Sequence, residues 1–178
     1  MALLSNNNAF QSAWVVADFD EAIKFWANTF GVGPFYALDY KSGPELVYRG
    51  EPGELEMKVA WAQAGDMQVE LIHPTSESPN VYRDLVPAGV TQFHHICYWS
   101  DDIAADTAVL TQAGHQCAMA SGPGATQFAY FDTSSINGHM IELLERLEGM
   151  AGIFDAIKSI ASTWDGERPA REFAELLG

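Results

Sequence analysis

Cysteine, positive charge and long apolar runs are all scarce in this chain of 178 residues. The two cysteines, Cys97 and Cys117, are too few for a disulfide framework, so we expect free thiols and a reducing, cytoplasmic location. No apolar run approaches the roughly 20 residues that a membrane-spanning helix needs. The first residues also lack the basic end and the apolar stretch of a signal peptide, so we expect no leader.

The shortage of positive charge limits the expected partners. Lys and Arg number 9 against 24 Asp and Glu, which gives a net charge of −15. Nucleic acids and anionic membranes attract basic surfaces, so neither is an expected partner. Because 48% of the residues are hydrophobic, the chain can still bury a substantial core. The charge does not identify a substrate.

The most informative feature is an internal repeat, in which residues 95–144 follow the plan of residues 11–74. Aligning Asp18 with Asp102 places Gln11 opposite His95, because each lies at the same distance upstream. In both copies the patterning predicts a strand, a helix and three further strands. The expected strands and helices are 13–16, 18–31, 35–40, 55–62 and 67–72 in the first copy, and 95–99, 103–113, 116–119, 127–131 and 139–144 in the second.

The same repeat proposes a metal site. The Glu-Leu pairs near the end of each copy place Glu70 opposite Glu142. A carboxylate between apolar neighbours in a strand is costly unless it is paired or binds a metal. Two-fold assembly of the copies would bring both carboxylates, His95 and Gln11 into one cavity. One nitrogen and three oxygen ligands suit a divalent ion with water in the free positions.

A separate segment follows the repeat. Apolar residues recur at helical spacing from Leu147 to Trp164, which predicts an amphipathic helix, and residues 170–177 are expected to form a last short helix. Such an extension either covers an open edge of its own body or packs across a homodimer. Both interpretations stay open, and a homodimer is the expected assembly.

The residues of the predicted site also carry a resemblance to a known family. The chain resembles the vicinal oxygen chelate superfamily, which includes glyoxalase I and methylmalonyl-CoA epimerase, over about residues 9–146. Segment 70–79 and the run Phe93-His-His-Ile-Cys97 are similar to the epimerase branch. That branch usually has His where this chain has Gln11, whereas the order Gln, Glu, His, Glu matches eukaryotic glyoxalase I.

The resemblance implies a fold and a set of ligands. The expected class is α+β, with two βαβββ modules at about 9–75 and 93–146 that form a cup around a metal ion, followed by a helical extension at 147–178. The metal would be a divalent ion such as Zn, Ni, Co, Mn or Mg. Its implied ligands are Gln11, Glu70, His95 and Glu142.

The implied activity is proton transfer beside a carbonyl. The expected enzyme is an isomerase, epimerase or lyase that works through a metal-bound enediolate, with Glu142 as the first choice of base and Glu70 as the second. The substrate would be a carbonyl compound, and the resemblance alone implies a thioester or a thiol adduct. Four residues are expected to line its cavity, although each also fits a core position: Gln68, Trp99, Phe128 and Tyr130.

Several alternatives accompany this interpretation. A non-catalytic binding protein of the bleomycin-resistance type would need the cup but no metal. An extradiol-type dioxygenase would need two His and one Glu, and strand 127–131 supplies no His. His94 is expected to point away from His95 and to be structural. The loop 121–126 fits a phosphate cradle and a plain turn equally well.

Overall fold

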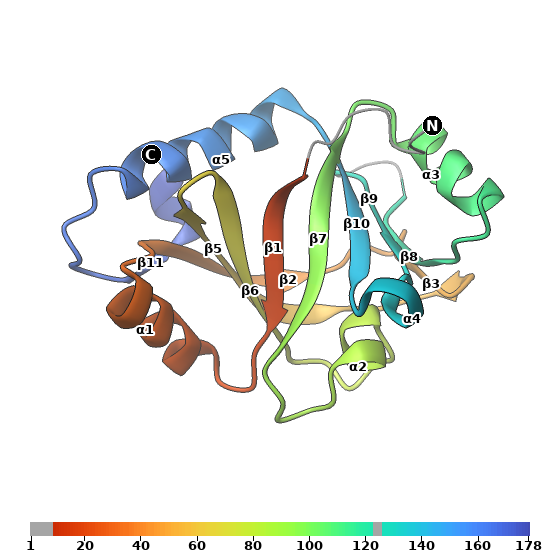
Figure 1. Ribbon diagram of the computed structural model, residues 1–178, viewed down its shortest axis with the longest axis horizontal. Coiled ribbons are helices and arrows are strands. Elements are labelled where there is room, and N and C mark those ends of the chain that lie inside the picture. The colour runs from red at the N-terminus through yellow and green to blue at the C-terminus, as the bar shows by residue number, and fades with distance from the viewer. Residues whose placement is uncertain (1–8, 123–125) are drawn as a thin grey trace.

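A single mixed sheet organises the molecule in the computed structural model, which describes residues 9–122 and 126–178. Eleven strands follow the order β11-β2-β5-β6-β1-β7-β10-β9-β8-β3-β4. The sheet curves, with α1 and α3 against its outer face and α5 across one end (Figure 1). Within the described ranges, no helix is long and apolar enough to cross a membrane.

The internal repeat appears as two copies of one strand and helix order. The first comprises β1 (Ala9–Val15), α1 (Phe19–Phe30), β2 (Phe35–Lys41), β5 (Glu56–Ala64) and β6 (Met67–Pro74). The second comprises β7 (Gln92–Ser100), α3 (Ile103–Gln112), β8 (Cys117–Ala120), β9 (Phe128–Phe131) and β10 (Met140–Glu145). In each copy the first strand pairs in parallel with the last, and β1 pairs antiparallel with β7. These four strands therefore form the centre of the sheet, as the resemblance implies.

Aligned aspartates start the two main helices. Asp18 accepts a hydrogen bond from the Glu21 amide, and Asp102 accepts one from the Ala105 amide, at 3.0 Å in both cases. Each carboxylate satisfies a backbone donor that the first helical turn leaves free. Gly31 ends α1 with a positive φ of 65°, which glycine adopts without strain. The alignment of Asp18 with Asp102 thus rests on a shared capping role.

A hairpin that the sequence patterning did not reveal joins the two copies. It comprises β3 (Val47–Tyr48) and β4 (Glu51–Pro52), and β3 pairs with β8 of the second copy. A short helix, α2 (Val81–Leu85), occupies the link between the copies. The hydroxyl of Tyr48 donates to Asp84 on α2 over 2.6 Å, and the guanidinium of Arg49 donates to the same carboxylate over 2.7 Å. The link is therefore ordered and fixed to the hairpin.

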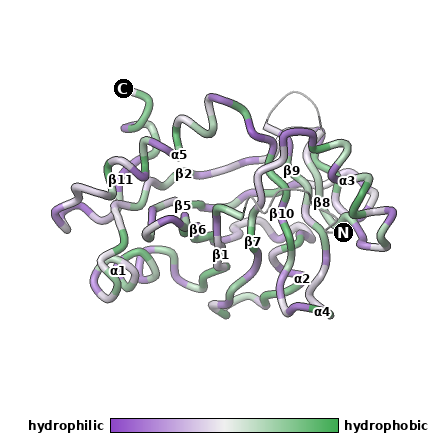
Figure 2. The backbone as a smooth tube through the Cα atoms, turned by 45° about the horizontal axis from the view of Figure 1, so that its top comes forward, coloured by the Kyte–Doolittle hydropathy of each residue, from purple (hydrophilic) through white to green (hydrophobic). Residues whose placement is uncertain are grey.

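The C-terminal extension packs on its own chain. Helix α5 (Glu148–Ala161) lies against β5, and Ile157 on its inner face is fully buried. The prediction of a helix over 170–177 is wrong for its first residues, which form the strand β11 (Ala170–Glu172). The residues that follow form a 3-10 helix, η1 (Phe173–Leu176). The edge strand β2 explains the difference, because its free backbone groups pair with β11 in parallel register. The loop between α5 and β11 is hydrophilic and projects from the body (Figure 2).

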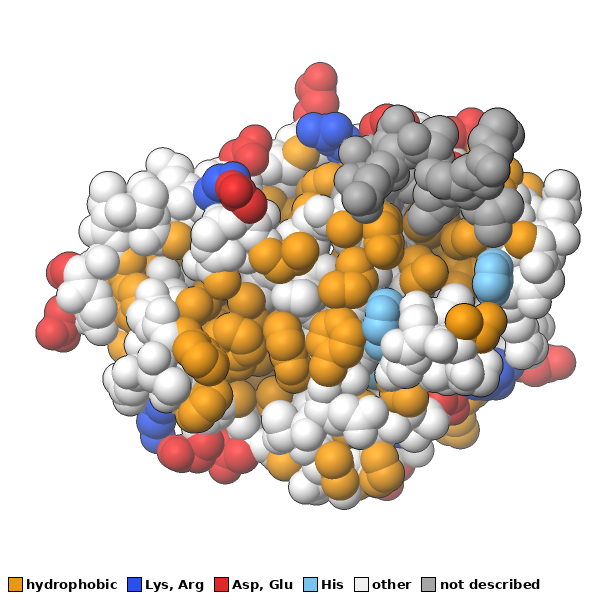
Figure 3. Space-filling view, viewed as in Figure 1, with side chains coloured by type: hydrophobic (Ala, Val, Ile, Leu, Met, Phe, Trp, Pro, Cys, Tyr) orange, Lys and Arg blue, Asp and Glu red, His pale blue; other side chains and the backbone are white. Residues whose placement is uncertain are grey.

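Apolar side chains fill both faces of the sheet. One buried cluster lies inside the curve of the sheet, two others lie under α1 and α3, and a fourth lies under α5. Hydrophobic side chains also gather on the outer surface that Figure 3 shows. Under and beside α1, ring contacts link Phe30, Trp26, Trp14 and Phe93 into one row. The inner cluster is the one that borders the predicted metal ligands.

Candidate metal centre

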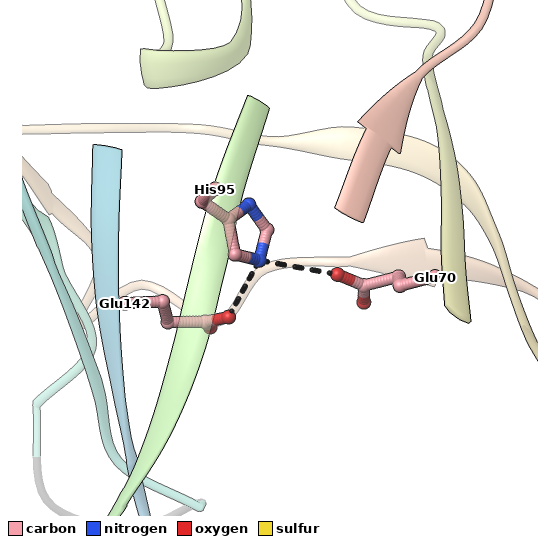
Figure 4. A group of neighbouring side chains, drawn as sticks. All are labelled: Glu70, His95 and Glu142. Atoms are coloured by element: carbon pink, nitrogen blue, oxygen red, sulfur yellow. Dashed lines mark ion pairs between the residues drawn. The ribbon is translucent and has the colours of Figure 1, made fainter. Parts of the chain in front are cut away.

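Three predicted ligands meet inside the curve of the sheet. Glu70 comes from β6, His95 from β7 and Glu142 from β10, and their side chains point toward one another (Figure 4). His95 Nε2 lies 2.9 Å from Glu142 Oε2 and 3.4 Å from Glu70 Oε2. One donor atom from each residue lies within 4.8 Å of the other two. These distances fit three ligands around one ion.

The sheet register explains how these side chains meet. Ala13 on β1 pairs with Glu70 on one side and with His95 on the other. Its methyl group is the smallest side chain that could stand between two larger ones, and it leaves the space above β1 open. Glu142 pairs with Cys97, two residues beyond His95 on the same strand. Cys97 is a buried free thiol whose pKa burial raises well above its usual value, which suits a core position rather than a nucleophile.

Two atoms of this group are buried without a well-oriented hydrogen bond. Glu70, His95 and Glu142 are all buried, and His95 has no exposed surface. Among the described residues, Glu70 Oε2 and His95 Nε2 are buried polar atoms without a hydrogen-bond partner. Such atoms are rare in proteins because each costs free energy unless a partner compensates it. A divalent cation at their meeting point would satisfy both atoms.

The position of His94 corrects the sequence interpretation. Ala13 pairs with His95 and the next residue of β1 pairs with Phe93, so His94 is the extra residue of a β-bulge. The bulge breaks the alternation of side chains, and His94 Nδ1 lies 3.0 Å from His95 Nδ1 instead of pointing away from it. His94 is therefore in direct contact with a predicted ligand.

The hydrogen bonds of His94 decide which nitrogen of His95 faces the centre. His94 Nε2 lies 3.0 Å from the Val81 carbonyl oxygen, which can only accept, so Nε2 donates. Burial lowers the pKa of His94 to about 3, so the ring is neutral and its Nδ1 accepts the proton of His95 Nδ1. This arrangement leaves His95 Nε2 to face the two carboxylates, as a metal-binding imidazole requires.

The two carboxylates also control the proton of His95. Burial alone would lower the pKa of His95. The negative charge of Glu142 and its hydrogen bond to the ring oppose this effect, and Glu70 contributes in the same way. Together the two carboxylates raise the pKa of His95 to about 9. Burial raises the pKa of Glu70 above its usual value, although His95 opposes the shift. A cation bound here would replace the proton on His95 Nε2.

Gln11, the fourth predicted ligand, lies beside the three others. It is buried and borders the same cavity as Glu70 and Glu142. Its amide nitrogen donates to Gln68 Oε1 over 2.6 Å, which leaves the Gln11 amide oxygen for another partner. Through this hydrogen bond Gln68 orients the side chain of Gln11. A ligand role for Gln11 stays a prediction.

A cavity of about 300 Å³ adjoins the centre. Of the residues expected to line it, Phe128 and Tyr130 do so, whereas Gln68 and Trp99 border a separate small pocket. The Trp99 ring stacks on Phe10 at 4.0 Å and packs with Phe154 of α5, which holds it away from this cavity. Part of the loop 121–126 lies outside the described residues, so the suggested phosphate cradle stays untested.

Among the lining residues that the sequence did not reveal, Trp61 and Tyr82 make hydrogen bonds at the centre or beside it. The Trp61 indole donates to Glu70 Oε1 over 2.8 Å. The tight turn at Gly65 and Asp66 puts Trp61 directly opposite Glu70, so the hairpin register could have revealed it. Tyr82 lies on α2, and its hydroxyl is 3.0 Å from the hydroxyl of Tyr130. No periodic pattern in the link could have placed Tyr82 there.

Comparison with known proteins identifies the family. The family model of the glyoxalase/bleomycin resistance protein/dioxygenase superfamily matches residues 10–131. The chain belongs to this superfamily. Its members form the group that the resemblance named, so the expected family and fold are confirmed. No curated protein matches the chain at a significant level.

Solved structures share the superfamily fold at low identity. A hypothetical protein from Bacillus halodurans is 20% identical, with a TM-score of 0.54 over 79% of this chain and 94% of that chain. Methylmalonyl-CoA epimerase from Mycobacterium tuberculosis is 18% identical, with a TM-score of 0.54 over 84% and 96%. A Streptomyces coelicolor methylmalonyl-CoA epimerase variant in complex with 2-nitronate-propionyl-CoA is 20% identical, with a TM-score of 0.51 over 81% and 97%. At this identity the matches show the fold alone.

Proposed function

We propose that this superfamily member is a metal-dependent isomerase, epimerase or lyase that moves a proton beside the carbonyl of a small molecule. The observation that carries the proposal is the pair of buried carboxylates on either side of His95 Nε2, both at the wall of one cavity. Carboxylates in an apolar cavity are suited to take and return protons. The epimerases among the structural relatives support epimerisation as one of these reactions.

The proposed metal ligands are Glu70, His95 and Glu142, with Gln11 as the fourth. Hard carboxylate and amide oxygens with one imidazole suit a divalent ion in an open site. When bound, such an ion polarises the carbonyl and stabilises the negative charge that develops as the α-proton leaves.

The structure supports Glu142 as the first choice of base. Glu70 is held by the Trp61 indole and has its other oxygen directed at His95. Glu142 contacts His95 and lies beside the Cys97 thiol, which is a weaker hydrogen-bond donor than the Trp61 indole. A carboxylate with fewer constraints can rotate toward a substrate carbon and take its proton. Delivery of a separate proton from Glu70 to the opposite face of the same carbon, while Glu142 keeps the proton that it took, gives epimerisation. Delivery by Glu142 of its proton to the neighbouring carbon gives isomerisation.

Isotope exchange tests this proposal directly. The protein loaded with Mn²⁺ is incubated in D₂O with a panel of carbonyl compounds, and mass spectrometry measures deuterium at the α-carbon. We expect exchange in at least one compound, and removal of the metal by a chelator should abolish it. A metal-free protein that binds a member of the panel with full affinity, and exchanges nothing when loaded, would instead support the binding-protein alternative.

A further inference from the structure

The cavity beside the candidate metal centre has almost no polar wall. Its charged lining residues are Glu70 and Glu142 themselves, and the remaining polar groups are the neutral Gln11, Thr126 and tyrosine hydroxyls. The other walls are aliphatic and aromatic side chains, such as Leu38, Met57 and Phe128. A volume of about 300 Å³ lies at the lower end for a small-molecule site. A ligand here would be compact and mostly in contact with apolar groups.

No lysine or arginine lines this cavity among the described residues. None of the nine Lys and Arg residues is among the residues that line it, and residues 1–8 and 123–125 contain neither type. Five of the nine form ion pairs with acidic residues elsewhere. The first amides of α2, which carries the lining residue Tyr82, are already bonded to Asn80 Oδ1. Phosphates and carboxylates are normally recognised by Arg, Lys or free helix amides, so this wall has nothing to hold them.

The C-terminal extension supplies the aromatic part of the wall. Met150 and Phe154 of α5 and Phe173 of η1 all border the cavity. The rings of Phe154 and Phe173 pack against Trp61 at 6.1 and 5.6 Å, and Trp61 in turn holds Glu70. The solved relatives are covered over 94% to 97% of their length but match only 79% to 84% of this chain. The family model also ends at residue 131, so this aromatic wall lies beyond the matched region.

We propose that the site accepts a compact, uncharged carbonyl compound with an aromatic or branched alkyl body and two adjacent oxygens, and that it rejects compounds that place an anionic group inside the cavity, such as the carboxylate of a methylmalonyl group. The apolar body would pack against Trp61, Phe154 and Phe173, while the two oxygens face the carboxylates and His95. An anionic body would lose its hydration without gaining a basic partner, beside two carboxylates and in a chain of net charge −15. This inference rests on the proposed function in one respect, namely that the two adjacent oxygens of the ligand bind the proposed metal ion.

The test uses two probes with the same chelating head. Phenylacetohydroxamic acid has a neutral body, and its 4-carboxy derivative differs by one charge. Calorimetry measures the binding of each probe, and of methylmalonyl-CoA, to the full chain with and without Mn²⁺. We expect the neutral probe to bind at least roughly tenfold more tightly than the carboxylated one, since an unpaired buried charge is costly. Methylmalonyl-CoA should not bind measurably.

A matched pair of variants attributes this preference to the cavity. Phe173→Arg places one positive charge at the cavity wall and should narrow the ratio between the probes, whereas Phe25→Arg on the exposed side of α1 should leave it unchanged. If Phe173→Arg fails to fold, the ratio in the wild type still decides. The proposal is overturned if the carboxylated probe binds as well as the neutral one, if methylmalonyl-CoA binds more tightly, or if neither probe binds. Failure of the proposed function would appear differently, as probe binding that keeps its ratio but does not depend on Mn²⁺.

Discussion

The two carboxylates of the candidate centre differ in how firmly the protein holds them. Glu70 accepts a hydrogen bond from the Trp61 indole, whereas Glu142 contacts His95 and the Cys97 thiol, a weak donor. Both stand at equivalent points of the internal repeat, so the difference comes from their surroundings. Trp61 has a hairpin position opposite Glu70, whereas Tyr130 stands opposite Glu142 and directs its hydroxyl to Tyr82. In the proposed function, this asymmetry would make Glu70 the more fixed ligand and Glu142 the more mobile base.

Substitution of each carboxylate by its amide tests that distinction. Glu142→Gln can still offer an oxygen to a metal but cannot take a proton, so proton-transfer activity should fall by roughly 10²- to 10⁴-fold with the fold intact. Glu70→Gln should cost less in a one-base isomerisation and about as much in a two-base epimerisation. Rates of α-deuterium exchange measure both effects, and wild-type exchange in Glu142→Gln would remove Glu142 from the role of base.

The raised pKa of His95 predicts a pH-dependent metal affinity. The pKa of about 9 means that His95 carries a second proton, on Nε2, at lower pH. A metal ion must displace this proton in order to bind Nε2. Affinity for Mn²⁺ should therefore rise by about tenfold per pH unit between pH 6 and 8 and level off as the pH approaches 9. Calorimetry in two buffers of different ionisation enthalpy should find one proton released per ion. An affinity that is constant across this range would contradict the protonated state of His95.

At the scale of elements, the bulge in β7 places two consecutive side chains on the same side of the strand, which a regular strand cannot do. It brings two consecutive histidines into contact, so that one ring orients the other. The backbone carbonyl of Val81 at the start of α2 anchors the outer ring. The orientation of the metal-facing nitrogen therefore depends on an element in the link between the two copies.

Removing His94 should weaken metal binding although His94 is not a ligand. Loss of a group that orients a ligating imidazole typically costs roughly 10- to 100-fold in metal affinity. We expect that loss in His94→Ala and a smaller one in His94→Gln, whose amide oxygen can accept the same proton. His115→Ala serves as the control, because its side chain lies outside the cavity. Equal affinities in wild type and His94→Ala would mean that the bulge has no influence on the centre.

The sequence was informative about elements wherever a periodic pattern or a cap marked them. The repeat and its two capping aspartates indicated the order of strands and helices and the residues Glu70, His95 and Glu142 that meet in space, and the family resemblance supplied the fold. Side-chain alternation failed at His94, because a bulge depends on pairing with another strand. It failed again at residues 170–172, where the free edge of β2 imposes a strand. Tyr82 escaped notice because a five-residue helix leaves no detectable period.

At the scale of the whole molecule, the extension completes the body that the two copies begin. Strand β11 covers the edge of β2, and α5 buries Phe154 and Ile157 against the sheet. The same segment forms a wall of the cavity. The packing of the body and the shape of the cavity therefore depend on one part of the chain, while the expected homodimer stays a prediction.

Loss of the extension should affect the whole molecule. Truncation after Arg146 exposes Tyr36, Trp61 and the edge of β2, so we expect aggregation or a changed oligomeric state. The single substitution Ile157→Ala should lower the free energy of unfolding by about 2–5 kcal/mol, as for other fully buried Ile residues. Light scattering and urea denaturation measure the two effects. A truncated protein that is soluble, with native mass and stability, would show that the extension is dispensable.

The most direct test of the account is the metal content of two proteins purified side by side. We predict about one divalent ion per chain in the wild type after incubation with Mn²⁺ and removal of excess ion, because Glu70, His95 and Glu142 converge on a single point. His95→Ala lacks the nitrogen at the centre of that group and should retain almost none, while His115→Ala should retain as much as the wild type. Elemental analysis by mass spectrometry gives the ratio of metal to protein. Equal metal content in the wild type and His95→Ala, or none in either, would contradict the assignment of this site as a metal centre.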